Sequence, residues 1–135
     1  MHDLAVQLRA GQLYLHNAHN IGSKGPSFFS DHKWFGKSYA AFEEAYDHVV
    51  ERMIGLGYDI DLQSITKNAA KEAASYSTAV MTPELCFRTQ LKIEQEICSL
   101  IRGYVPNVDD GTQNLLQGLA DDSLDRQYQI KQRLS

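Results

Sequence analysis

Histidines and carboxylates of this 135-residue chain recur at spacings that would let them bind a metal ion. All five histidines lie within the first 48 residues. Imidazole and carboxylate groups are common ligands of metal cations in proteins. On a helix that turns 100° per residue, His32, Asp47 and Glu51 fall at about 0°, 60° and 100°, within one sector of the surface. Asp47 and Glu51 are i, i+4 neighbours, so they could bind one cation together.

The distance between these residues along the helix predicts that two chains share the site. His32 and Asp47 are fifteen residues apart, which is roughly 22 Å along a helix axis. They therefore cannot bind the same ion within one chain. If two copies of the helix pack antiparallel about a two-fold axis, the His32 end of one lies against the carboxylate end of the other. His19, at the end of the preceding helix, would then fall near His32.

Hydrophobic residues that recur every three or four positions predict the helices that carry these side chains. The first helix is expected from about Asp3 to Asn20, before a turn that is rich in glycine. The second ends at Gly55 or Gly57, and its inner stripe is Phe35, Tyr39, Phe42, Tyr46, Val49, Met53 and Leu56. Because the connection is short, these two helices should be antiparallel neighbours.

The second half of the chain predicts two further long helices. Thr82, Pro83 and Glu84 are typical of a helix start, and this helix should run to about Gly103. Asp110 and Gln113 resemble a capping box, and the fourth helix would bury Leu115, Leu116, Leu119, Leu124, Tyr128 and Ile130. The connection between residues 58 and 81 is predicted to be helical at most around residues 61–74. The expected fold is all-α: a ferritin-like four-helix bundle whose long crossover contains a short helix.

Composition excludes several other classes of protein. Apolar residues make up 43% of the chain and charged residues 22%, which predicts one globular domain over residues 1–135. The formal net charge of -4 argues against a dedicated nucleic-acid binder. No apolar stretch is long enough to cross a membrane, and the N-terminus lacks the pattern of a signal peptide, so a cytoplasmic location is expected.

One run of residues carries a resemblance to a known family. The run HNIGSKGPSF at residues 19–28, followed by His32, Asp47 and Glu51-Arg52, resembles the signature of the Dps family, the ferritin-like mini-ferritins. A weaker similarity extends over residues 111–116. The resemblance implies that His19 and His32 of one subunit and Asp47 and Glu51 of its two-fold partner form a ferroxidase site. It also implies that hydrogen peroxide, or less efficiently dioxygen, oxidises iron, which is stored in a hollow dodecamer and so kept from causing oxidative damage.

The sequence departs from the family pattern in three places. One extra residue separates His19 from Gly25-Pro26, so His16, on the same helical face, is an alternative ligand. Gly36 stands where the family has a further carboxylate, so a second iron would be bound weakly, through water, or by Glu43 or His48. Asn20 replaces an aromatic residue, and Trp34 is either the oxidisable aromatic near the site or an interface residue.

Other functions give distinct expectations. A bacterioferritin-like or di-iron carboxylate protein needs Glu-x-x-His motifs, which the sequence lacks, and Glu94 is the only obvious inward carboxylate of the third helix. A DNA-binding protection protein of this type would use a tail rich in Lys and Arg; none occurs, so weak or absent DNA binding is expected. A shell without ferroxidase activity is the third alternative. Acidic side chains either line pores and a mineral surface or form a solvated face: Glu72, Asp109, Asp110, Asp121, Asp122 and Asp125.

Overall fold

The computed structural model describes residues 1–77 and 80–135, and these residues form helices and turns with no β-strand among them. The elements, in chain order, are α1 (His2–Asn17), the π-helical turn η1 (Ala18–Gly22), α2 (Phe28–Gly55), α3 (Leu62–Tyr76), α4 (Pro83–Tyr104), the 3-10 turn η2 (Val105–Asn107) and α5 (Asp110–Leu134). The all-α prediction is confirmed. In the described residues, no helix has the length and apolar character needed to cross a membrane.

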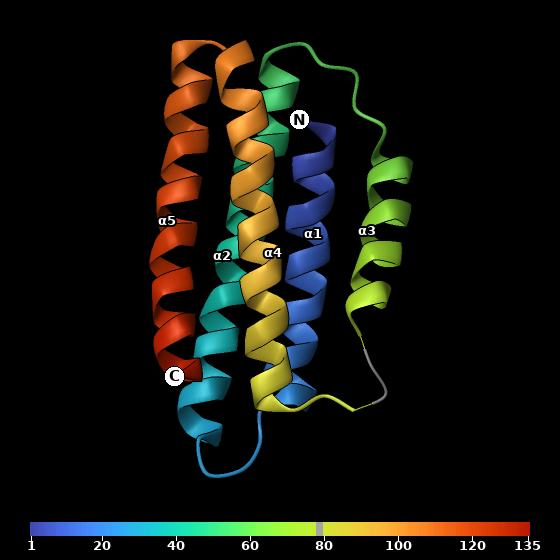
Figure 1. Cartoon of the computed structure of the whole chain (residues 1–135). Coiled ribbons are helices and arrows are strands. Elements are labelled where there is room, and N and C mark those ends of the chain that lie inside the picture. The colour runs from blue at the N-terminus through green and yellow to red at the C-terminus, as the bar shows by residue number, and fades with distance from the viewer. Residues whose placement is uncertain (78–79) are drawn as a thin grey trace.

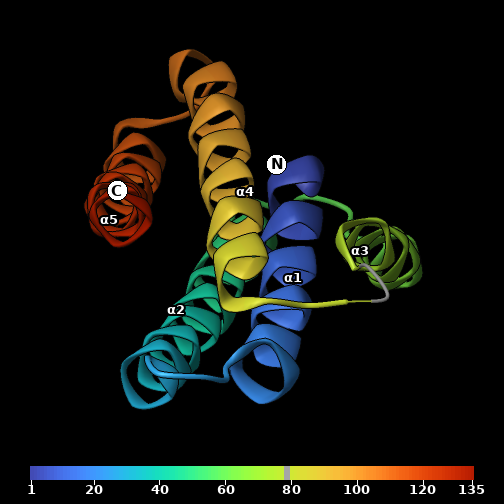
Figure 2. The same cartoon turned by 60° about the horizontal axis from the view of Figure 1, so that its bottom comes forward.

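Four long helices form a bundle, and the fifth lies outside it (Figure 1). α1 packs against α2 and α4, while α4 packs against α5. Figure 2 shows α3 beside α1, away from α5. The contact between α3 and α1 uses small side chains, with Ala69 and Ala73 against Ala10. Small residues let two helix backbones approach closely, so α3 covers α1 and leaves the outer side of α2 uncovered.

Local signals begin and end the helices, with one correction to the sequence prediction. Thr82 accepts a hydrogen bond from the Leu85 amide at 3.2 Å and Pro83 opens α4, as predicted. At α5 the capping residue is Asp109, whose carboxylate accepts from the Thr112 amide at 2.9 Å and from its hydroxyl at 2.8 Å. The predicted capping box at Asp110 is therefore wrong by one residue. The two Thr112 donors also lower the pKa of the Asp109 carboxyl below its ordinary value.

α2 ends in a Schellman motif. The Tyr58 amide donates to the Met53 carbonyl at 3.0 Å, and the Gly57 amide donates to the Ile54 carbonyl at the same distance. Gly57 has a φ of 80°, a left-handed conformation that glycine adopts without a Cβ clash. Leu56 comes after the last helical residue and is exposed, so it does not extend the buried stripe of the helix.

The buried stripe of α5 differs from the prediction. Leu116 and Ile130 are buried, but Leu124 and Tyr128 are 56% and 65% exposed. Two polar residues, Ser123 and Gln127, occupy the inward positions instead. They face inward because a buried carboxylate on α4, that of Glu94, accepts a hydrogen bond from the Ser123 hydroxyl at 2.6 Å. A prediction that places only apolar residues in the core therefore assigns the wrong side of α5 to the interior, in error by part of a helical turn.

An ion pair fixes the first turn of α2, which precedes the histidine of interest. Asp31 is buried, and its carboxylate accepts two hydrogen bonds from the Arg133 guanidinium, at 3.2 and 3.0 Å. The pairing raises the pKa of Arg133 above its ordinary value. Bidentate pairs of this kind restrict both side chains. The start of α2 is thus tied to the end of α5, 102 residues away in the sequence.

Candidate metal centre

His19 and His32 form a reciprocal pair at the junction of η1 and α2. The Nδ1 atom of His19 donates to the main-chain carbonyl of His32 at 2.8 Å, and the Nδ1 atom of His32 donates to the carbonyl of His19 at 2.8 Å. The two rings are stacked with centroids 3.7 Å apart. Because a carbonyl oxygen only accepts, each Nδ1 must carry a proton, and in the neutral form of either ring Nε2 then keeps its lone pair. This tautomer leaves Nε2 as the atom that could bind a metal ion.

The π-helical turn places His19 in this pair. η1 widens the end of α1 over Ala18–Gly22, which takes up additional chain length before Gly25 and Pro26. π-Turns of this kind accommodate one extra residue within a helix. The turn is held by the Ser23 hydroxyl, which donates to the Ala18 carbonyl at 3.0 Å. With this turn in place, His19 lies within hydrogen-bond distance of the His32 main chain.

The alternative ligand, His16, has a different neighbour. Its ring stacks on Tyr39 with centroids 4.4 Å apart and lies 6.5 Å from the ring of His19. Tyr39 also meets His19 edge-on at 5.4 Å. Phe28 stacks on the other side of the pair, 5.0 Å from the ring of His32. The histidine pair is thus enclosed between two aromatic rings, while His16 lies at the exposed edge of this cluster.

Gly36 and His19 occupy adjoining space. A Cβ atom at position 36 would lie 3.1 Å from both Cε1 and Nδ1 of His19. That separation is tighter than ordinary van der Waals contact, so any side chain at this position would require the His19 ring to shift. A carboxylate side chain at position 36 would therefore require His19 to move from its place against His32.

Asp47 and Glu51 lie further along α2, and the chain does not bring them to the histidines. Both are exposed. In residues 1–77 and 80–135, no three His, Cys, Asp or Glu side chains converge closely enough to hold a metal ion. That two chains share the ligand set therefore stays a prediction. The remaining candidates, Glu43 and His48, are exposed as well.

Trp34 points into the bundle. Its indole Nε1 donates to Oε1 of Gln90 on α4 at 2.9 Å, and its ring lies 6.4 Å from that of Phe87. Its hydrogen-bond partner is thus on α4, away from the histidine cluster. Tyr39, which sequence reasoning placed only in the buried stripe, is the aromatic residue that touches both His16 and His19. Its position seven residues after His32, two helical turns along the same side, was the available signal.

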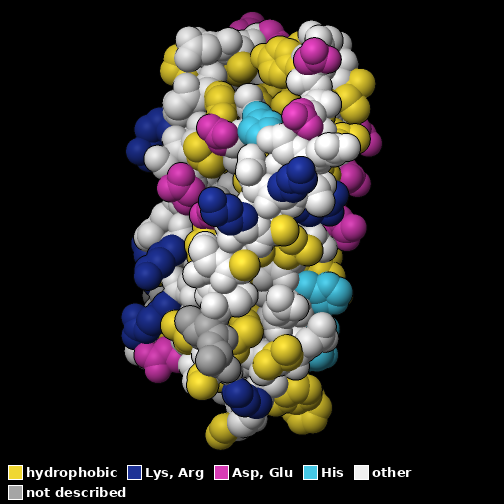
Figure 3. Space-filling view, turned by 90° about the vertical axis from the view of Figure 1, so that its right-hand side faces the viewer, with side chains coloured by type: hydrophobic (Ala, Val, Ile, Leu, Met, Phe, Trp, Pro, Cys, Tyr) yellow, Lys and Arg dark blue, Asp and Glu magenta, His cyan; other side chains and the backbone are white. Residues whose placement is uncertain are grey.

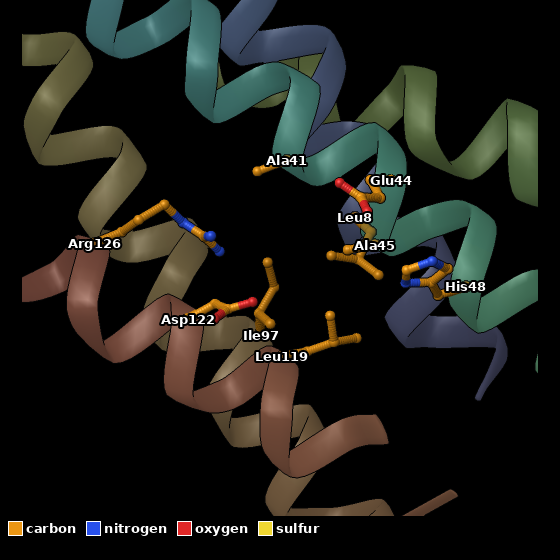
Figure 4. Close-up of a pocket in the computed structure, with 9 residues that line it drawn as sticks. All are labelled: Leu8, Ala41, Glu44, Ala45, His48, Ile97, Leu119, Asp122 and Arg126. Atoms are coloured by element: carbon orange, nitrogen blue, oxygen red, sulfur yellow. The ribbon is translucent and has the colours of Figure 1, made fainter. Parts of the chain in front are cut away.

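Inside the bundle, a buried glutamate of α4 is paired with an arginine of α5. Glu94 is 0% exposed and pairs with the Arg126 guanidinium, Nε to Oε1 at 2.6 Å and Nη2 to Oε2 at 3.1 Å. Gln90 donates to the same carboxylate at 3.3 Å. Figure 4 shows Arg126 reaching from α5 into a cavity of about 130 Å³ between α2 and α5, whose wall includes Glu44 and His48. The inward carboxylate of α4 is therefore neutralised by arginine.

Six acidic side chains were considered above as pore or surface residues, and two of them have structural roles. Asp109 caps α5, and Glu72 accepts a hydrogen bond from the Tyr76 hydroxyl at 3.0 Å. The other four are exposed. Figure 3 shows the face of the molecule on the α3 side, where basic and acidic side chains alternate instead of gathering into one basic patch. Such mixing on this face offers no extended track for a phosphate backbone.

Comparison with known proteins assigns the family. The family model of the ferritin-like domain matches residues 1–135, the full length of the chain. No curated protein matches the chain. The helical bundle and the whole-length match lead to one conclusion: the chain belongs to the ferritin-like domain family.

Proposed function

We propose that the chain is the subunit of a Dps-like mini-ferritin that oxidises Fe(II) and stores the ferric product in a hollow dodecameric cage. Each ferroxidase site would take His19 and His32 from one subunit and Asp47 and Glu51 from its two-fold partner. The observation that carries this proposal is the reciprocal bonding of the two histidines, which leaves Nε2 of both rings available. Iron is the substrate and the cargo of this activity.

The ligand set suits the reaction. Neutral imidazoles bind Fe(II), and the two carboxylates supply negative charge that favours the ferric product. With hydrogen peroxide, two Fe(II) ions each give up one electron, the O–O bond breaks, and two protons from solvent complete two water molecules. The carbonyl groups that hold Nδ1 keep both rings oriented through this change of charge, because they accept the Nδ1 protons throughout.

The pairing of Glu94 favours this site over one inside the bundle. An intra-bundle di-iron centre needs inward carboxylates that are free to bind metal. The bidentate Arg126 pair already satisfies both carboxylate oxygens of Glu94. We therefore expect Asp47→Ala to abolish iron oxidation and Glu94→Gln to leave it largely intact. The opposite pattern would move the site into the bundle.

Complementation between two inactive variants tests the shared site. His32→Ala and Asp47→Ala subunits should each be inactive alone. In a mixed dimer, one of the two sites combines intact histidines with intact carboxylates. Random mixing makes about half of the dimers heterodimers, so co-assembled cages should recover about a quarter of the wild-type Fe(II)-dependent peroxide consumption. Verified mixed cages without recovery would refute ligand sharing.

Native mass provides an independent test. Twelve chains of 15.2 kDa would sediment as a particle of about 180 kDa, whereas a dimer would sit near 30 kDa. A stable monomer would remove the only geometry in which His32 meets Asp47. A cage that consumes no peroxide with Fe(II) would indicate a shell without ferroxidase activity. A gel shift at physiological salt should show no tight DNA complex.

A further inference from the structure

The outer face of α2 separates its charges by sign. Lys33 and Lys37 lie before Ala40, and four exposed carboxylates follow it: Glu43, Glu44, Asp47 and Glu51. Among the described residues, ion pairs join Arg88 to Glu84, Arg126 to Glu94 and Arg133 to Asp31, so none of these six side chains is paired within the chain. The face is also left uncovered by α3, which packs on α1.

This arrangement is unfavourable in an isolated chain. Lys33 and Lys37 are i, i+4 neighbours of like charge, and so are Asp47 and Glu51. Like charges at this spacing repel one another on a helix, whereas opposite charges attract. A second chain that brings carboxylates to the lysines would turn both repulsive sets into attractive contacts.

We propose that this charge separation selects a second copy of the chain as partner and sets its antiparallel register, with Lys37 of each chain opposite Glu44 of the partner subunit. The inference rests on the proposed function and adds to it what directs the pairing. In this arrangement, the outer face of α2 contacts the same face of α2 in another subunit.

Two sets of residues give the same register. In an antiparallel pair of identical helices, the numbers of two facing residues have a constant sum. If His32 faces the midpoint between Asp47 and Glu51 of the partner subunit, that sum is about 81. That register places Lys37 opposite Glu44 of the partner subunit and Lys33 beside the partner's Asp47. The lysines do not belong to the proposed ligand set, yet the register that the ligand set requires also brings them to carboxylates of the partner subunit.

The helical positions of the paired residues also match. Measured from His32, Lys37 falls at about 140° and Glu44 at about 120°, along the edge of the outer face where Glu44 also borders the cavity that Arg126 enters. A two-fold axis perpendicular to the helices brings the same edge of each helix together. Ala40, at about 80°, falls next to the axis, where its small side chain permits the backbones to approach to about 8–10 Å.

Charge reversal tests the register on the metal-free protein, with sedimentation as the readout. Lys37→Glu and Glu44→Lys each place like charges opposite one another at two symmetric positions. We expect either variant to raise the dissociation constant of the two-fold pair by at least about tenfold at low salt. Lys67→Glu, the same charge change on the exposed side of α3, is the matched control and should assemble like the wild type.

The decisive measurement mixes the two variants. A chain with Lys37→Glu and a chain with Glu44→Lys are complementary at both positions, so the equimolar mixture should assemble although neither does alone. The double variant Lys37→Glu/Glu44→Lys should also assemble with itself, and it tests the register even if one single variant does not fold. Single variants that assemble like the wild type, or a mixture and double variant that stay apart, would overturn the proposal.

Iron oxidation is measured separately, so the two proposals can fail independently. The double variant keeps His19, His32, Asp47 and Glu51. If the double variant assembles but neither it nor the wild type oxidises iron, the register stands and the proposed function fails. If the wild type oxidises iron and charge reversal leaves its assembly unchanged, the function stands and the register fails.

Discussion

Replacement of Arg126 by methionine should destabilise the bundle strongly, because it leaves a carboxylate unpaired in the interior. Glu94 is 0% exposed, and Arg126 supplies two of its hydrogen bonds. Removing one partner of a buried ion pair costs about 3–5 kcal/mol. Ser123 and Gln90 still donate to the carboxylate, so a value of about 3 kcal/mol is expected. For a chain of this length that corresponds to a loss of roughly 10 °C in Tm.

Urea unfolding followed by far-UV circular dichroism measures this loss. All variants are compared at one protein concentration, because assembly makes the unfolding midpoint depend on concentration. Arg88→Met is the matched control: its pair with Glu84 is exposed, with side chains 57% and 67% accessible, so its loss should cost less than about 1 kcal/mol.

A double variant separates the charge from the packing. Glu94→Gln with Arg126→Met removes both charges while the amide carbonyl still accepts from Ser123. We expect it to recover more than half of the stability lost in the single arginine variant, because no unpaired charge remains inside. If Arg126→Met costs no more than Arg88→Met, the assignment of Glu94 as a buried, arginine-neutralised carboxylate is refuted.

Three further predictions concern local structure and pH. Thr82→Ala should lower the free energy of unfolding by about 1 kcal/mol through loss of the α4 cap, and an unchanged urea midpoint would contradict the capping role. Gly57→Ala should cost about 1 kcal/mol because its φ of 80° is unfavourable for alanine; a gain in stability in urea would argue against the Schellman ending of α2. Burial raises the pKa of the Tyr14 phenol above its ordinary value of 10.0, so the unfolded state ionises first and stability should fall as the pH rises above about 10. Tyr14→Phe should make that decline shallower in urea titrations at successive pH values, and an identical pH profile would exclude this contribution.

The sequence alone determined the features that depend on neighbours along the chain. The start of α4 at Thr82 and Pro83 and the end of α2 at Gly55 were predictable because caps and helical periodicity act within a few residues. The placement of His32, Asp47 and Glu51 on one side of α2 followed from the helical repeat. So did the inference that one chain cannot unite them, since the rise per residue fixes their separation.

Only the tertiary structure decided which side chains meet across the bundle. The reciprocal bonds of His19 and His32 join residues 13 apart, through a π-turn that no local propensity signals. The Glu94–Arg126 pair joins residues 32 apart, and it turned Ser123 and Gln127 inward where the hydrophobic pattern predicted Leu124 and Tyr128. Such pairings depend on the relative rotation and height of packed helices, which side-chain packing fixes in three dimensions and helical periodicity leaves open.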